Sequence, residues 1–440
     1  MPSILALILY TTFVLFLLRL DRKQYPDASL SLWLPTFLLL IITGKALGTW
    51  FGISGATMEE GSAIDRNVLI LLLCLGLLIL KKRNVNITGV FRQNISVVLL
   101  IGFMLISVTW SDMPFISFKR WIRNIIPIVM ALIIASEDDP RQALQSVFRR
   151  LVYIYIPFSH MLIKYYPHLG RKYGLWSGEL MWVGVSDQKN GLAFICMFTI
   201  FFLVWTLIRR WKSRDNPVWY QTYIDIFIIF LSIWLFMGPN QKLTYSATSM
   251  VALAIALISL FGFLWLKKHN IIIGVKTLTI LIVAIIIFGT ATVFVGHLPI
   301  FQPPEVLNRD ATLTGRSEIW AFLVPYAKEK PILGHGFGGF WTSELRSTGN
   351  FPAHNGYLET ILVTGFIGLL FLSIFLIENC RRAQRLMTID FDWGIFWFCI
   401  LLIGVTRNIT ESVIMNLSGY MPAILLFILI PSINFSEQAK

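Results

Sequence analysis

The chain has 440 residues, of which 56% are hydrophobic and only 14% are charged, whereas soluble domains carry about 25% charged residues. This composition excludes a soluble globular protein and indicates an integral membrane protein. The net charge of +13 therefore does not point to nucleic acid as a partner, because basic residues of membrane proteins gather in cytoplasmic loops.

The apolar runs predict an all-α, polytopic membrane protein with about twelve or thirteen transmembrane helices, because about 20 apolar residues span a bilayer. No internal repeat or linker is visible, so residues 1–440 are expected to form a single membrane domain. The expected spans are, in chain order, 3–19, 31–50, 67–80, 94–110, 122–136, 147–163, 190–208, 222–238, 247–266, 273–295, 356–378, 393–407 and 412–431.

Basic clusters predict the topology, because successive clusters are separated by two expected spans. All of them can then lie on one side of the membrane, and the positive-inside rule makes that side cytoplasmic. The clusters are Arg19/Arg22/Lys23, Lys81/Lys82/Arg83, Arg141/Arg149/Arg150, Arg209/Arg210/Lys212/Arg214, Lys267/Lys268 and Arg381/Arg382/Arg385. The other loops are expected to face outward, and 296–355 is the longest of them.

The segment 312–365 is the longest one that no membrane helix can absorb. A helix is expected over 319–330, where apolar residues recur at helical spacing and Pro331 follows, although Pro325 interrupts the pattern. The run GHGFGGF does not follow a predicted strand, so it indicates a tight turn rather than a dinucleotide site.

Basic residues also lie in the outward loops, where they oppose the topology signal. Each could be surface decoration, but together they indicate an anionic ligand, because Arg and Lys pair with phosphate oxygens. Lys189 can alternatively extend its ammonium group to the interface, and Arg316 can pair with Glu318 or Asp310. The set comprises Lys119, Arg120, Arg123, Arg171, Lys172, Lys189, Lys242, Arg309, Arg316, Arg346 and Arg407.

His354 precedes Asn355 at the entry to the expected span 356–378. An imidazole titrates near neutral pH and can accept a proton from a sugar hydroxyl, so His354 is a candidate general base. Glu359 is near in sequence and could orient the ring, while a hydrogen-bonded interfacial histidine is the alternative. His335 in the Gly-rich run is a second, weaker candidate.

The sequence contains no HExxH, GxSxG or P-loop motif. The four cysteines show no CxxC or Cys/His spacing, which argues against a metal site and a disulfide framework. No metal and no cofactor are therefore expected.

The order TGRSEIW, PILGHGFGGF and HNGYLETILVTGFIGLLFL resembles the superfamily of O-antigen ligases and Wzy-type polysaccharide polymerases. Lys189-Asn190 resembles the basic-Asn pair at a helix head in that superfamily, and Lys242 lies just before YSATSMVAL, which resembles its Ser/Thr-rich segment. The early segments are more similar to exopolysaccharide-production proteins than to lipopolysaccharide ligases.

The resemblance implies a metal-independent transfer of a glycan from an undecaprenyl-diphosphate carrier to a hydroxyl acceptor. His354 and Arg316 would then be catalytic. The substrate-binding residues that it implies are Lys189, Asn190, Lys242, Asn355, Tyr357 and Arg120. The implied partners are the lipid-linked donor, a glycan or lipid-linked acceptor and membrane lipids, with a chain-length regulator and a flippase as further candidates.

A polymerase of exopolysaccharide or O-antigen is the leading hypothesis, and transfer to lipid A core is the alternative within the same chemistry. A flippase would show pseudo-symmetric halves with charges inside the spans, whereas here the charges concentrate in loops. The expected location is the bacterial inner membrane, with the site in 296–355 facing the periplasm.

Overall fold

The computed structural model describes residues 1–52, 62–174, 178–212, 219–239, 246–271, 274–295, 316–348 and 352–432. Almost all of its regular structure is helical, and the strands in this part of the chain are the short antiparallel pair β1 (Arg171–Tyr173) and β2 (Leu180–Trp182). The chain is thus an all-α, multi-pass membrane protein, as its composition predicts.

Seven helices of the described segments are long and apolar enough to cross a membrane. An eighth span is possible if α5 (Ile87–Gln93) and α6 (Ile95–Ser107), which meet at a bend of 97°, count as one. The seven are α1 (Ser3–Gln24), α4 (Ala63–Lys82), α10 (Lys189–Lys212), α11 (Trp219–Met237), α12 (Ala247–Lys268), α13 (Val275–Phe294) and α16 (Gly356–Ile389).

The structure has fewer long apolar helices among its described residues than the sequence has apolar runs, because some runs are interrupted or form short helices. The run 31–50 is divided at Gly44 and Lys45 into α2 (Trp33–Thr43) and α3 (Leu47–Trp50). The run 412–431 contains a loop before the short α18 (Tyr420–Leu429), and α17 (Phe391–Arg407) has only 17 residues. The twelve or thirteen expected spans therefore include several helices that are shorter or more charged than the seven long apolar ones.

Contacts divide the chain into two compact units that alternate along the sequence. Unit 1 comprises Met1–Ile53 and Ser136–Ile258, and unit 2 comprises Ser54–Ala135 and Ser259–Lys440. The expectation of a single domain over 1–440 stays a prediction.

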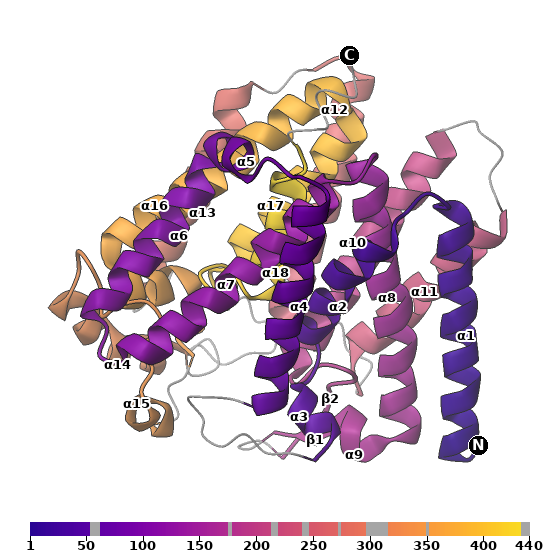
Figure 1. Cartoon of the computed structure of the whole chain (residues 1–440), viewed down its shortest axis with the longest axis horizontal. Helices are drawn as coiled ribbons and strands as arrows, with labels where there is room; N and C mark the ends of the chain where they lie inside the picture. The colour runs from indigo at the N-terminus through magenta and orange to yellow at the C-terminus, as the bar shows by residue number, and fades with distance from the viewer. Residues whose placement is uncertain are drawn as a thin grey trace. The chain divides into compact units, whose positions relative to one another are not determined.

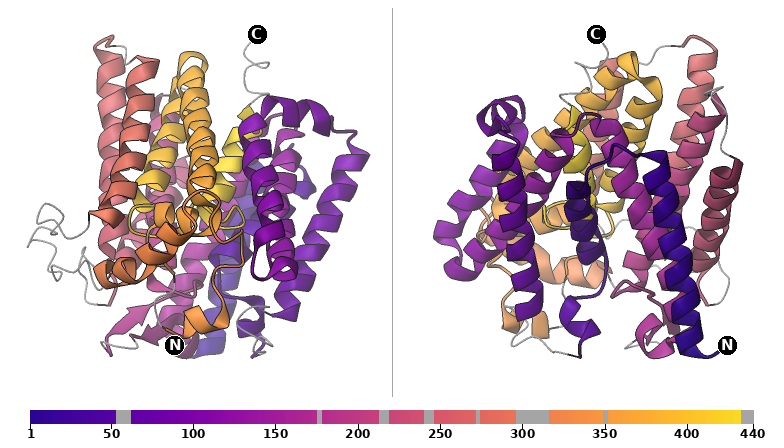
Figure 2. Two further views of the ribbon diagram at one scale, coloured as in Figure 1. Left: turned by 90° about the vertical axis from the view of Figure 1, so that its left-hand side faces the viewer. Right: turned by 45° about the vertical axis from the view of Figure 1, so that its right-hand side comes forward.

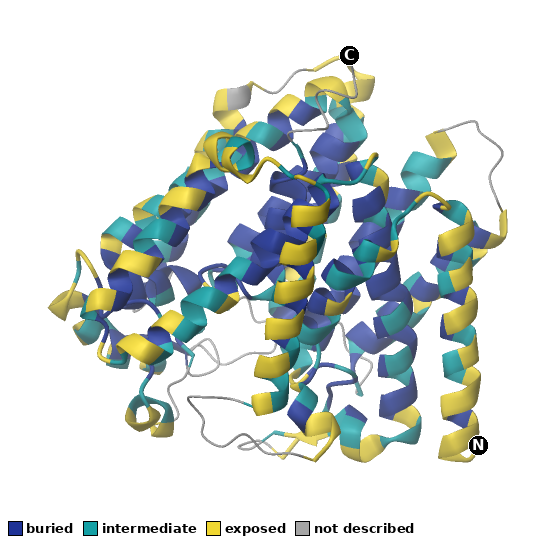
Figure 3. Ribbon diagram, viewed as in Figure 1, coloured by how far each residue is buried: buried dark blue, intermediate teal, exposed yellow. Residues whose placement is uncertain are grey.

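In unit 1, α8 (Pro140–Tyr165) packs against α1, α2, α10 and α11, and Figure 1 shows α1 and α11 beside it. Asp139 caps α8 and Pro140 occupies its first turn, a combination that favours helix initiation. Figure 3 shows α10 largely buried, whereas α1 exposes much of its surface. The short helix α9 (Pro167–Gly170) and the strand pair follow α8.

Buried ion pairs join the helices of unit 1. Arg149 and Arg210 both contact the fully buried Asp225, at 3.2 and 3.0 Å, and Arg150 contacts Asp21 at 2.8 Å. Arg149 and Arg150 thus lie inside α8, and the expected span 147–163 also contains both of them. Removing either partner of such a pair would leave an uncompensated buried charge.

In unit 2, α16 is the central helix and packs against α6, α13 and α17. The left-hand view of Figure 2 shows α13 and α16 running side by side. Two short helices precede it, α14 (Arg316–Glu329) and α15 (Ser343–Ser347). The expected helix over 319–330 therefore begins three residues earlier, and Pro325 lies inside it without ending it.

The Gly-rich run folds against the start of α7 (Pro114–Ala135) and the segment before it. Gly336 has a φ of +92°, and a side chain there would meet Ser111. The backbone N–H of Phe337 donates to Ser107 Oγ at 3.1 Å, and Arg120 donates to the carbonyl oxygen of Gly338. The run is a tightly packed turn, as predicted.

Candidate functional site

Asn355 forms the N-cap of α16 and is fully buried. Its side-chain oxygen accepts from the backbone N–H groups of Tyr357 and Leu358, both at 2.9 Å. Its amide nitrogen donates to the carbonyl oxygens of Gly289 and Ile409, both at 3.0 Å. Asn355 therefore uses its amide to join three segments, and its expected role in sugar binding stays a prediction.

Gly356 and Tyr357 complete this junction. A Cβ on Gly356 would lie 1.9 Å from Asn408 Oδ1, so only glycine permits this contact. Tyr357 is fully buried, packs over Gly289 and donates its hydroxyl to the carbonyl oxygen of Val405 at 2.9 Å. Tyr357 thus has a packing role in the fold, and its expected contribution to the sugar site stays a prediction.

His354 adopts a φ of +51°, which is uncommon for a residue with a side chain. Strained conformations of this kind persist where the surrounding structure holds them, and they often occur at functional sites. The Asn355 cap that follows directly supplies such support. Nδ1 of His354 lies 3.6 Å from Glu411 Oε2, and 29% of the side chain is exposed.

Glu411 also pairs with Arg316, whose guanidinium nitrogen lies 3.0 Å from Glu411 Oε1. One carboxylate thus contacts the two residues that the sequence identifies as catalytic candidates. Arg316 starts α14, His354 precedes α16, and Glu411 follows α17, so three elements converge here. Arg316 thus pairs with Glu411, which the sequence did not suggest, and the expected partner Asp310 lies outside the described residues.

The charges around Glu411 fix its ionisation state. Burial raises the pKa of its carboxyl, but His354 and the positive charges of Arg316 and Arg407 outweigh burial and hold the pKa below its usual value. Glu411 is therefore ionised at neutral pH and can stabilise positive charge on His354.

Glu359 does not orient His354, although its place in the sequence suggested that it could. Its carboxylate accepts instead from Trp341 Nε1 and, at 3.4 Å, from the backbone N–H of Ala353. Trp320 of α14 donates to the carbonyl oxygen of the same Ala353 at 2.9 Å. Both contacts hold the backbone just before His354.

Lys189 and Asn190 begin α10 and are half-buried, in unit 1. The segment before them is held by Lys45, which donates to the carbonyl oxygens of Gly184 and Ser186. Their approach to Arg316 stays a prediction, because Arg316 belongs to unit 2. Lys242 lies outside the described residues.

Arg120 lies in unit 2 on α7 and lines a pocket with four other basic residues. His335 is buried, contacts the carbonyl oxygen of Tyr326 at 3.1 Å and packs against Phe340. His335 therefore has a packing role. Within the described ranges, no three His, Cys, Asp or Glu side chains come close enough to hold a metal ion.

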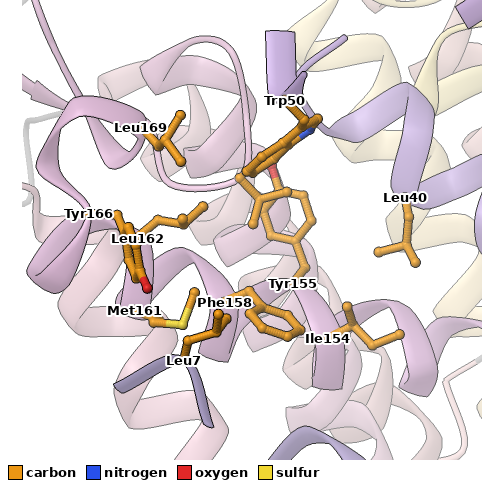
Figure 4. A pocket seen from close by; sticks show the side chains of 11 residues that line it. Leu7, Leu40, Trp50, Ile154, Tyr155, Phe158, Met161, Leu162, Tyr166 and Leu169 are labelled. Carbon is orange, nitrogen blue, oxygen red and sulfur yellow. The ribbon is translucent and has the colours of Figure 1, made fainter. Parts of the chain in front are cut away.

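A second pocket, in unit 1, has an almost wholly apolar lining and a volume of about 390 Å³. Figure 4 shows Tyr155, Phe158, Met161 and Leu162 of α8 around it, with Trp50 from α3. It presents no acid, base or nucleophile, so it is not a candidate for the reaction.

Sequence reasoning missed Glu411. It lies 57 residues beyond His354 in a short loop, and no local motif joins the two. The available signal was topological, since the loop 408–411 was expected on the same face as 296–355.

The comparisons with known proteins agree with the motifs. Residues 228–373 match the family model described as O-antigen ligase. The chain is 22% identical over 324 residues to an exopolysaccharide production protein, ExoQ, of Rhizobium meliloti (strain 1021). That match covers 66% of this chain and 65% of the relative, slightly less than two thirds of its length.

No solved structure matches the chain significantly. The matched family segment contains Arg316, His354 and most of α16. The two matches support the resemblance of this chain to the superfamily of O-antigen ligases and Wzy-type polysaccharide polymerases.

Proposed function

We propose that the chain transfers a glycan from a lipid-diphosphate carrier to a hydroxyl acceptor and so extends or attaches a polysaccharide. The observation that carries this proposal is the contact of one ionised carboxylate, Glu411, with both Arg316 and His354. The family match and the exopolysaccharide relative support the reaction class.

Glu411 sets the tautomer of His354 in this proposal. The carboxylate lies 3.6 Å from Nδ1, so in the proposed complex it favours a neutral imidazole with its proton on Nδ1 and its lone pair on Nε2. Nε2 accepts the proton of the acceptor hydroxyl, and the imidazolium that forms is stabilised by Glu411. This arrangement follows the logic of a base oriented by a carboxylate.

Bond making and breaking are then balanced. The acceptor oxygen attacks the anomeric carbon, and the bond from that carbon to the carrier phosphate breaks. The electron pair of this bond stays on the diphosphate, where negative charge develops. Arg316 lies near this charge in the proposed complex, and Lys189, Asn190, Lys242 and Arg120 are the further candidates for binding the donor.

Two acceptors fit this chemistry, and each has one supporting observation. The relative is named for exopolysaccharide production, which favours a growing glycan as the acceptor. The family model is described as a ligase, which favours transfer to a different lipid such as lipid A core. The proposed location is the bacterial inner membrane, with the site facing the periplasm.

Reconstitution of the purified protein in liposomes with a lipid-linked oligosaccharide tests the function. Products with two or more repeat units on one carrier, together with released lipid diphosphate, are the expected result. Transfer only to an added lipid A core would identify a ligase, and transfer that stops with EDTA would overturn metal independence. Donor movement across the bilayer without any glycosidic product would contradict the proposal and indicate a flippase.

A further inference from the structure

Five basic side chains surround a pocket of about 360 Å³ within unit 2. The pocket lies between α4 and α7, two helices that pack against each other, and α15 contributes Arg346. Its polar residues are Ser62, Asp65, Arg66, Lys119, Arg120, Arg123 and Arg346.

The polar residues on α7 share one face of the helix. Arg123 lies four residues after Lys119 and three after Arg120, so both place a side chain on the face that carries Arg123. Ile126 continues this face one turn farther along. An arginine among apolar residues such as Ile122 is costly in a membrane unless it faces a polar cavity or an anion.

The helix α4 presents a matching face. Asp65 and Arg66 lie in its first turn, and Leu69, Ile70 and Leu73 follow at helical spacing toward its middle. The two helices run in the same direction, because Gly76 packs against Val129 farther along both of them. The pocket is therefore basic at one end and apolar at the other.

From its basic end to its apolar end the pocket extends roughly 10 Å along α7, since a helix rises about 1.5 Å per residue between Lys119 and Ile126. This length accommodates the first part of a lipid chain below a headgroup. Asp65 offsets one positive charge through Arg123, so the lining of the pocket carries a net positive charge that favours an anion. The pocket thus offers a basic end for a headgroup, and this end continues into an apolar end for a lipid chain.

Arg346 connects this pocket to the region of His354. Its Nε donates to the carbonyl oxygen of Trp341 at 3.1 Å, and Trp341 Nε1 donates to Glu359. Glu359 in turn accepts from Ala353, the residue before His354. An occupant that moves Arg346 would therefore act on the backbone that carries His354.

We infer that the pocket between α4 and α7 binds the phosphate headgroup of a lipid, with the lipid chain along Leu69, Ile70 and Leu73. The headgroup phosphates contact the basic residues of α4, α7 and α15. An isoprenoid diphosphate and a bilayer phospholipid share this chemistry. Only the choice of the isoprenoid lipid rests on the proposed function.

Binding to the full-length protein in phosphatidylcholine nanodiscs tests the inference, with farnesyl diphosphate as the probe. The double variant R66A/K119A is expected to weaken binding at least tenfold, because two headgroup contacts are lost. The matched control is K82A, an exposed lysine at the other end of α4, which is expected to bind as the wild type does. Thermal unfolding of each variant shows whether it is folded, and R123Q supplies a second variant if the double variant is not.

Two further probes separate the parts of the ligand. Inorganic diphosphate and farnesol are each expected to bind at least tenfold more weakly than farnesyl diphosphate, and L69S is expected to weaken only the farnesylated probe. Phosphatidylglycerol that competes equally with farnesyl diphosphate identifies a bilayer phospholipid as the source, and weaker competition identifies the isoprenoid.

Three outcomes would overturn the site. The first is an unchanged affinity of R66A/K119A and R123Q for farnesyl diphosphate. The second is binding of inorganic diphosphate as tight as that of farnesyl diphosphate. The third is a loss of affinity in K82A as large as in R66A/K119A. H354Q is expected to bind the probe normally, so failure of this binding site and failure of the proposed reaction are distinguishable.

Discussion

His354 and Glu411 face each other at 3.6 Å although 57 residues separate them in the sequence. The contact depends on a junction in which the Asn355 cap joins the ends of α13, α16 and α17. Because Arg316 contacts the other oxygen of the same carboxylate, the positions of both candidate catalytic residues depend on Glu411.

The first prediction concerns the pH dependence of stability. The pKa of Glu411 is lower in the folded protein than its ordinary value of 4.5, so the ionised carboxyl stabilises the fold. This contribution is fully present above about pH 4.5 and is lost as the pH falls through the lower, folded-state pKa. E411Q is therefore expected to lower the melting temperature markedly at pH 7 and much less at about pH 3.5.

Thermal unfolding in detergent at several pH values measures this difference. Loss of a charge-assisted contact costs about 1.5–3 kcal/mol. The control is E344Q in α15, an exposed glutamate in the segment that precedes His354. If E411Q lowers the melting temperature equally at both pH values, the ionised carboxyl of Glu411 does not stabilise the fold as predicted.

The second prediction concerns the close contact at Gly356. G356A is expected to abolish transfer and to lower stability, because the added methyl group would overlap Asn408. The matched control is G102A in α6, where nothing lies within 4 Å of the added Cβ. G102A is expected to be as active as the wild type and up to about 1 kcal/mol more stable. Glycan transfer and thermal unfolding are measured for both variants. Normal transfer by G356A would show that the reaction does not depend on the close contact between Gly356 and Asn408.

The third prediction separates the charge of Arg316 from its geometry. R316A is expected to reduce transfer at least a hundredfold, and R316K is expected to retain part of it, because lysine supplies a point charge without the planar fork. Rates in the reconstituted assay, with protein level as the control, measure both effects. Equal activity of R316A and the wild type would remove Arg316 from the site.

The fourth prediction is topological. The segment 296–355 is expected to face away from the cytoplasm, and Ser343 is an exposed position within it. In a variant without the native cysteines, S343C is expected to react with a membrane-impermeant thiol reagent in intact spheroplasts. Reaction only in inverted vesicles would reverse the topology.

Local patterns in the sequence predict the features that depend on local physics. Hydropathy predicts the helical membrane fold, and the glycine spacing predicts the turn at 334–340. The TGR and HN motifs identify Arg316 and His354, which the structure brings to one carboxylate. These residues can be found because their chemistry is unusual in an apolar chain.

Long-range contacts could not be predicted in the same way. Glu411 lies in a short loop with no motif. The sugar-binding role of Asn355 follows from the family resemblance, whereas the contacts of its amide with Gly289 and Ile409 come from distant segments. The buried partners of Arg149 and Arg150, which are Asp225 and Asp21, are also distant in the chain. In each case the deciding partner comes from another helix.

Transfer by H354Q in liposomes with a lipid-linked oligosaccharide tests the central claim most directly. Glutamine retains a polar side chain but cannot accept the proton of the hydroxyl. A general base contributes roughly 10²–10⁴-fold, so transfer is expected to fall by at least a hundredfold while the donor remains on its carrier. H168Q, at an exposed histidine of α9, is the control and is expected to retain the wild-type rate. Near-normal transfer by folded H354Q would contradict the account.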